Sequence, residues 1–116
     1  MNVIPRELQG LAGFTVKELQ FVVDSPIGEW VLAGTKGRKR IRQIVACIIQ
    51  YDFEKGNWYS NGDIVHLCEL RDANGPSKMN ISNQRISALM RYLVAKGFLV
   101  QRTVKGMREY SKGDEQ

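Results

Sequence analysis

The residues best suited to chemistry in this 116-residue sequence lie on one side of a helix predicted over residues 82–95. At about 100° per residue, its apolar side carries Ile86, Leu89, Met90 and Leu93. The opposite side carries Gln84, Ser87, Ala88 and Arg91, flanked by Arg85 and Tyr92. Small residues in the middle of that side allow close approach to a surface, and the long donors can reach base edges or phosphates. Since the DNA major groove admits one helix, and Arg, Gln, Asn and Ser are its usual readers, duplex contact is one interpretation. A solvated helix face is the other.

The basic charge of the chain is concentrated in two segments. The net charge is +5, and the segments 38–57 (five basic and two acidic residues) and 81–97 (three basic, none acidic) each contribute +3. A surplus this localised favours a polyanionic partner, with nucleic acid first. From charge alone, a merely solubilising surface is the alternative.

A second candidate contact lies at the start of a helix predicted to run from Arg38 to about Glu54. Arg38, Lys39 and Arg40 crowd its first turn, although cations are favoured at the opposite end of the helix dipole. Such a conflict with local preference is common at functional sites. We therefore predict phosphate contact here, with a solvated turn as the alternative.

Other kinds of site find little support. The two cysteines, Cys47 and Cys68, lie among apolar neighbours and are expected to be buried thiols in a reducing compartment. A metal site recruiting them with Asp63 and His66 would lack a second close-spaced ligand pair. With one histidine, no glycine-rich phosphate loop and no carboxylate pair in an apolar context, we expect neither an enzyme nor a bound cofactor.

The remaining pattern predicts short elements. "TVKELQFVVDSP" begins with a capping box of Thr15 and Glu18 and must end at Pro26, whereas "IGEWVLAG" is ambiguous between a strand and a helical turn. "NWYS" suggests a short strand, and Ser60 can cap a helix over 61–70. After that helix, "DANGPSKMN" is a loop, and Ser82 or Asn80 caps the next helix. Gly97 suits the left-handed end of this helix, and Gly106 suits a hairpin turn between "FLVQRT" and "MREYS".

The order helix, strand, helix, helix, hairpin resembles the winged helix-turn-helix family over about Arg38 to Tyr110. The segment "ISNQRISALMRYLVAKGFLVQRTVKGMREY" carries most of the resemblance. It implies an α+β, mostly helical fold: a three-helix core plus a two- to three-stranded β-wing, preceded by an N-terminal extension. The corresponding division is 1–37 extension, 38–111 winged-helix domain and 112–116 polar tail.

The resemblance also implies which residues contact double-stranded DNA. Helix 82–95 would lie in the major groove with the hairpin of residues 98–111 as the wing. The bases would be contacted by Gln84, Ser87, Ala88 and Arg91. The backbone would be contacted by Ser60, Asn61, Asn83, Arg85, Arg102, Lys105 and Arg108, besides the predicted contacts at Arg38, Lys39 and Arg40. The link over roughly 71–81 is longer than the three- or four-residue turn of the family, so either the second helix extends into it or it is an inserted loop.

These features predict a sequence-specific DNA-binding protein, in particular a transcription regulator of bacterial, viral or plasmid type. The alternative is a winged-helix adaptor that binds a protein in a replication, transcription or host-takeover complex, because the fold alone does not fix function. The extension either packs on the first helix of the domain, anchored by Trp30, or forms a homodimer or partner contact. The sequence contains no apolar run of about 18 residues and no signal-peptide pattern, so we expect a cytoplasmic protein and no membrane partner.

Overall fold

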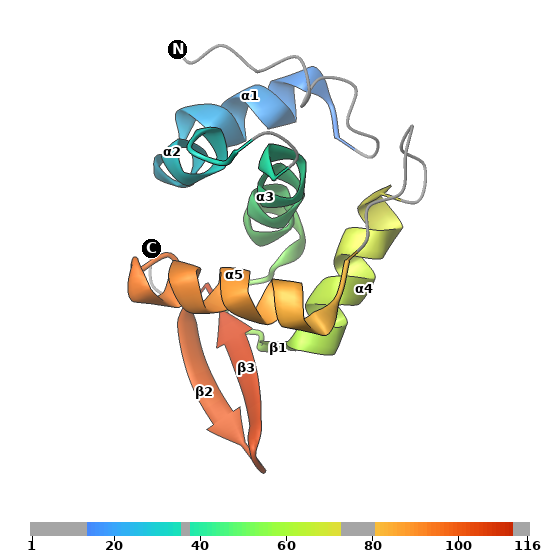
Figure 1. The fold of residues 1–116 in the computed structure, drawn as a ribbon, viewed down its shortest axis with the longest axis vertical. Coiled ribbons are helices and arrows are strands. Elements are labelled where there is room, and N and C mark those ends of the chain that lie inside the picture. Colours follow the sequence, from blue (N-terminus) through green and yellow to red (C-terminus); the bar gives the residue numbers. More distant parts are fainter. Residues whose placement is uncertain (1–13, 36–37, 73–80, 113–116) are drawn as a thin grey trace.

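The computed structural model describes residues 14–35, 38–72 and 81–112. In this part the chain is α+β, with five α-helices, one π-helical segment and a three-stranded antiparallel sheet (Figure 1). The helical elements are α1 (Val16–Asp24), α2 (Pro26–Leu32), α3 (Lys39–Cys47), the π-helical segment η2 (Ile48–Asp52), α4 (Asn61–Asp72) and α5 (Asn83–Ala95). The strands are β1 (Tyr59–Ser60), β2 (Val100–Val104) and β3 (Met107–Ser111).

The start of α1 is fixed by the predicted capping box. The Thr15 backbone N–H donates to Glu18 Oε1 at 2.8 Å, and the Glu18 backbone N–H donates to Thr15 Oγ1 at 3.1 Å. Pro26 ends α1 but occupies the first position of α2, where its missing N–H costs nothing. The ambiguous "IGEWVLAG" segment is therefore helical.

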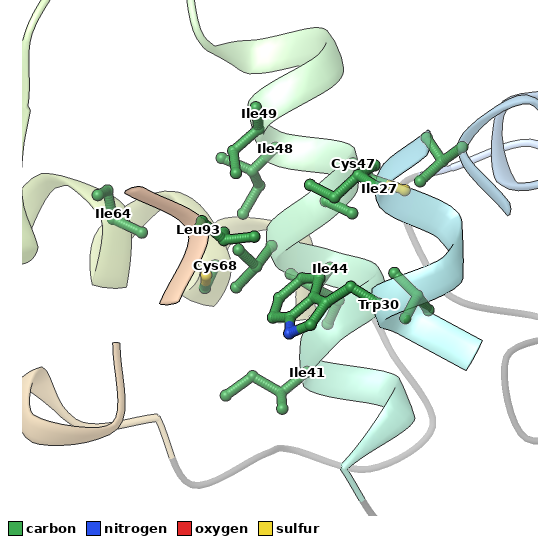
Figure 2. Packing of buried hydrophobic residues seen from close by; sticks show 14 of the residues in the cluster. Ile27, Trp30, Ile41, Ile44, Cys47, Ile48, Ile49, Ile64, Cys68 and Leu93 are labelled. Carbon is green, nitrogen blue, oxygen red and sulfur yellow. The ribbon is translucent and has the colours of Figure 1, made fainter. Parts of the chain in front are cut away.

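Helices α1 and α2 pack on α3, and their apolar side chains join one hydrophobic cluster with those of α3, α4 and α5. Figure 2 shows Trp30 of α2 lying beside Ile44 of α3, with Ile41 nearby. Trp30 is buried, so it anchors residues 14–35 to the rest of the molecule as predicted. Residues 14–35 thus pack on α3.

The long helix predicted from Arg38 does not remain α-helical to its end. After α3 the chain widens into η2, and the Phe53 N–H donates to the carbonyl of Ile48 at 2.9 Å, five residues back. Phe53 is buried and stacks on Tyr59 with ring centroids 4.2 Å apart. The widened turn thereby carries the chain from the core to β1.

Helices α4 and α5 begin and end largely as the sequence predicts. Ser82 caps α5 by accepting the Arg85 N–H at 3.2 Å, and Gly97 is left-handed with φ of 85°. The Phe98 N–H then donates to the Leu93 carbonyl and the Gly97 N–H to the Val94 carbonyl, a pairing that closes the helix. Helix α4 extends to Asp72, two residues beyond the prediction, and the rest of the predicted loop lies outside the described residues.

The hairpin forms a sheet with β1 in the order β1-β3-β2. Val104 pairs with Met107 across a two-residue turn, in which Lys105 and Gly106 have φ of 52° and 80°. Positive φ at both positions matches the twist of a tight hairpin, which explains the glycine. Figure 1 shows the hairpin projecting from beneath α5, with α4 meeting the other end of that helix.

Candidate nucleic-acid interface

The outward side of α5 is open to solvent. Ile86, Met90 and Leu93 are fully buried, and this fixes the rotation of the helix about its axis. The predicted base contacts consequently face outward: Gln84, Ala88 and Arg91 are exposed, and Ser87 is half-buried. Among the predicted backbone contacts on the same helix, Asn83 is exposed and Arg85 is half-buried.

The described N-terminal segment reaches α5 at the edge of this side. Trp30 stacks on Tyr92 with ring centroids 6.2 Å apart and an interplanar angle of 19°. Tyr92 is still 44% exposed. Helices α1 and α2 therefore leave Gln84, Ala88 and Arg91 accessible.

The hairpin places its basic residues on two different faces. Arg102 pairs with Glu109 and Thr103 with Arg108, and neighbouring pairs of an antiparallel ladder point to opposite faces. Arg108 consequently shares the face of Tyr110, which is buried, whereas Arg102 lies on the reverse face. One phosphate surface cannot meet both side chains in the same way.

Arg102 is already engaged by two neighbours. Its Nε donates to Glu109 Oε1 at 2.8 Å, and its guanidinium lies 4.4 Å from the centroid of the Trp58 ring. The carboxylate offsets its charge, and the ring holds it in place. Sequence reasoning missed Trp58 and Glu109 as modifiers of Arg102. The predicted turn had three residues, Val104–Gly106, and would have paired Arg102 with Arg108, whereas Val104 belongs to β2 and the observed turn has two residues.

The start of α4 carries its own carboxylate. The Ser60 N–H donates to Asp63 Oδ2 at 3.0 Å, and the Asp63 N–H donates to Ser60 Oγ at 3.2 Å. Ser60 thus caps α4, as predicted. Asp63, however, lies where a phosphate at this helix terminus would bind, which weakens the site predicted for Ser60 and Asn61.

The basic first turn of α3 lies apart from the hairpin. Figure 1 shows α3 beginning beside α1 and α2, towards the opposite end of the long axis from the hairpin. Arg38 is exposed, and Lys39 and Arg40 are half-buried. Arg42, in the next turn, donates from Nη1 to the Trp30 carbonyl at 2.7 Å and holds α2 on α3. The structure therefore brings together α5, the hairpin and the start of α4, but not the start of α3.

Neither cysteine is exposed. Both thiols are free and buried, as predicted, and burial raises the pKa of Cys47 from 9.0 to about 12, with a further increase from the charge of Glu18. Within residues 14–35, 38–72 and 81–112, no three His, Cys, Asp or Glu side chains gather as a metal site. No helix in those ranges has the length and apolar character needed to cross a membrane.

Comparisons with protein-family models, with curated proteins and with solved structures give no match for this chain.

Proposed function

We propose that this protein binds double-stranded DNA as a winged helix-turn-helix transcription regulator. Helix α5 would lie in the major groove, with Gln84, Ser87, Ala88 and Arg91 towards the bases. The element order α3-β1-α4-α5-β2-β3 and the sheet order β1-β3-β2 support this arrangement.

One observation carries the proposal. The outward side of α5 is exposed, and no acidic residue occurs between Ile81 and Gly97. Protein interfaces are depleted of charge at their centres, whereas duplex DNA attracts Arg and Lys. An exposed helix face with Arg91 near its middle is therefore better suited to DNA than to the centre of a protein interface.

The backbone contacts divide by position. Asn83 and Arg85 lie on α5 itself, whereas Lys105 lies in the turn of the hairpin and Arg108 on β3. Arg102 would contribute less, because Glu109 offsets its charge. The start of α3 lies at the same end of the molecule as α1 and α2 (Figure 1). Only a duplex long enough to pass that end would therefore contact Arg38, Lys39 and Arg40.

A salt series tests the proposal directly. Fluorescence anisotropy would follow binding to a labelled duplex enriched from a random-sequence pool. For four to six phosphate contacts, log Kobs should fall against log salt with a slope of about −4 to −5. Arg91→Ala should weaken binding to the enriched duplex by about 1–3 kcal/mol and relax sequence preference.

The matched control is Lys55→Ala, which removes one positive charge from the turn after η2, outside the proposed surface. It should leave sequence preference unchanged. A flat salt response, or equal effects of the two variants, would refute DNA recognition by α5 and favour the protein-binding adaptor.

We further propose that the regulator is a dimer formed through α1, η2 and α4. Phe21 and Leu70 are each 56% exposed and Tyr51 is 38% exposed, and exposed apolar side chains that gather on one surface mark interaction sites. Tyr51 lines two adjoining hollows, one of about 370 Å³ with Phe21 and Lys17 and one of about 530 Å³ with Leu70 and Glu54.

Two charges that are left to pair across these hollows favour a second copy as the occupant. Glu18 in the first hollow accepts the Thr15 N–H, and Asp52 in the second pairs with Arg71. A two-fold axis at Tyr51 would then place Lys17 against the partner's Glu54. The apolar side chains of each hollow, Phe21 in one and Leu70 in the other, would then be covered by the partner's opposite hollow, as an isologous interface requires. The surface lies on α1, η2 and α4, away from the hairpin, so dimerisation would leave the proposed DNA surface open.

A further inference from the structure

A hollow of about 470 Å³ lies where α2, the end of α3 with η2, and the segment following α5 meet. Its volume is within the range of small-molecule sites, about 300–1,000 Å³. It is separate from the outward side of α5 and from the surface around Tyr51, so neither DNA binding nor dimerisation uses it.

The floor of the hollow is apolar. Ile27 and Ile49 are buried, each with 8% of its surface exposed, and Phe98 is half-buried beside them. These side chains come from three different elements, so the floor depends on the packing of α2, η2 and the end of α5. Such a floor suits the hydrocarbon part of a ligand rather than a polar or highly charged one.

The rim is basic. Lys55 and Lys112 both line the hollow, and none of the described residues lining it is acidic. Lys112 Nζ donates to the carbonyl of Ile49 at 3.4 Å, a long hydrogen bond that keeps the ammonium beside the floor. Two ammonium groups above an apolar floor fit one anionic head group joined to an apolar body.

We infer that this hollow binds a small monocarboxylate with an apolar body, such as a short alkyl or aryl carboxylate. The carboxylate pairs with Lys55 and Lys112, and the body packs on Ile27, Ile49 and Phe98. Because the Phe98 N–H closes α5 through the Leu93 carbonyl, the ligand contacts the residue that ends this helix. The binding site itself does not depend on the proposed DNA recognition.

The test is an NMR titration of the full chain, uniformly labelled with ¹⁵N, using sodium octanoate and sodium benzoate as probes. Saturable shifts are expected at the amides of Ala46, Ile49 and Phe98. Octanol, which keeps the apolar body and lacks the carboxylate, should bind at least about tenfold more weakly than octanoate.

Lys55→Gln and Lys112→Gln should each weaken octanoate binding by about tenfold, whereas Lys96→Gln, a matched charge loss at an exposed position that does not line the hollow, should not. Both rim lysines lie outside the core, and the dispersion of the same spectra reports whether each variant is folded. The inference is overturned if no saturable shifts occur at the three amides. It is also overturned if octanol and octanoate bind equally, or if the rim variants bind like wild type. Since DNA is absent from the titration, failure of DNA binding would not affect these outcomes.

Discussion

The arginines of this chain are divided between structural and exposed positions by their immediate neighbours. Arg42 holds α2 on α3 through the Trp30 carbonyl, and Arg71 donates from Nε to Asp52 Oδ2 at 3.0 Å. Arg102 is held by Glu109 and Trp58. Arg91, by contrast, projects from the outward side of α5. Residue type alone therefore predicts charge, but the neighbour decides whether that charge is available to a ligand.

The pairing of Arg102 leads to a gain-of-binding prediction. Glu109→Gln removes the carboxylate that offsets Arg102, so duplex affinity should rise and the salt slope should steepen by about one contact. Since the pair lies near the surface, the free energy of unfolding should change by less than about 1 kcal/mol. Anisotropy salt series and urea denaturation measure the two effects.

Glu29→Gln is the matched control, because it removes one exposed negative charge on α2, away from the hairpin. It should change the salt slope little. If both variants tightened binding equally, the effect would come from net charge rather than from release of Arg102.

Cys47 gives a pH-dependent prediction. Burial raises its pKa to about 12, so the native thiol stays protonated at pH values where an unfolded thiol, with a pKa near 9.0, ionises. Its contribution to stability is therefore fully present below about pH 9 and is lost as the pH rises from there towards 12. Over this window the free energy of unfolding should fall more steeply for wild type than for Cys47→Ala, by up to about 1.4 kcal/mol per pH unit.

Urea denaturation at successive pH values measures this difference in slope. Lysine and tyrosine titrate in both proteins, so their contributions cancel in the difference. A thiol-reactive reagent provides a second readout, since native Cys47 should react only after unfolding. Parallel stability curves for the two proteins would contradict the assignment.

At the scale of elements, the helix ends were the most predictable feature. Thr15, Ser60 and Ser82 all cap as expected, because a side-chain oxygen beside a free backbone N–H is a local interaction that the sequence contains in full. Gly97 and Gly106 were predictable for the same reason, since each must adopt a positive φ that is set locally.

Elements that depend on distant partners were less predictable. "IGEWVLAG" has no decisive periodicity and becomes helical where Trp30 can enter the core. "IIQYD" is compatible with any helix, and its π-helical form follows from where Phe53 must be buried against Tyr59. Leu70 is exposed, because α4 presents Ile64 and Cys68 to the core.

The cap of α5 allows stability to be separated from DNA binding. Ser82→Ala should lower the free energy of unfolding by about 1 kcal/mol, because the Arg85 N–H loses its acceptor. Ser82→Asn should restore stability. Ser82→Asp should also restore it, since a carboxylate suits a helix N-terminus, yet it should weaken duplex binding by placing a negative charge at the groove.

Urea denaturation and duplex anisotropy on the three variants give the two readouts. The decisive comparison is between Asn and Asp, which cap similarly and differ in charge. Equal DNA affinity for these two variants would place the start of α5 outside the interface.

At the scale of the whole molecule, the sequence indicated the basic segments but not their relation in space. The surplus at the start of α3 and the one on α5 look like parts of one patch when read along the chain. Figure 1 instead shows the start of α3 beside α1 and α2, away from the hairpin. Arg102 and Arg108 likewise lie on opposite faces of the hairpin. Such relations follow from tertiary packing, so no local pattern could have supplied them.

The proposed dimer makes the last prediction, because one copy presents a single α5 to the duplex. Phe21→Glu should disrupt self-association by burying an unpaired charge in the apolar interface, whereas folding should persist, since Phe21 is largely exposed. Sedimentation equilibrium should show a dimer for wild type and a monomer for the variant.

If Lys17 meets the partner's Glu54, Lys17→Glu and Glu54→Lys should each weaken the dimer, and the double variant should restore it. The monomeric variant should still bind a single half-site but lose the preference for paired half-sites about one helical turn apart. The dimer proposal would be refuted if wild-type protein stayed monomeric at high concentration, both without DNA and on paired half-sites. The surface around Phe21 and Tyr51 would then be assigned to a different protein partner.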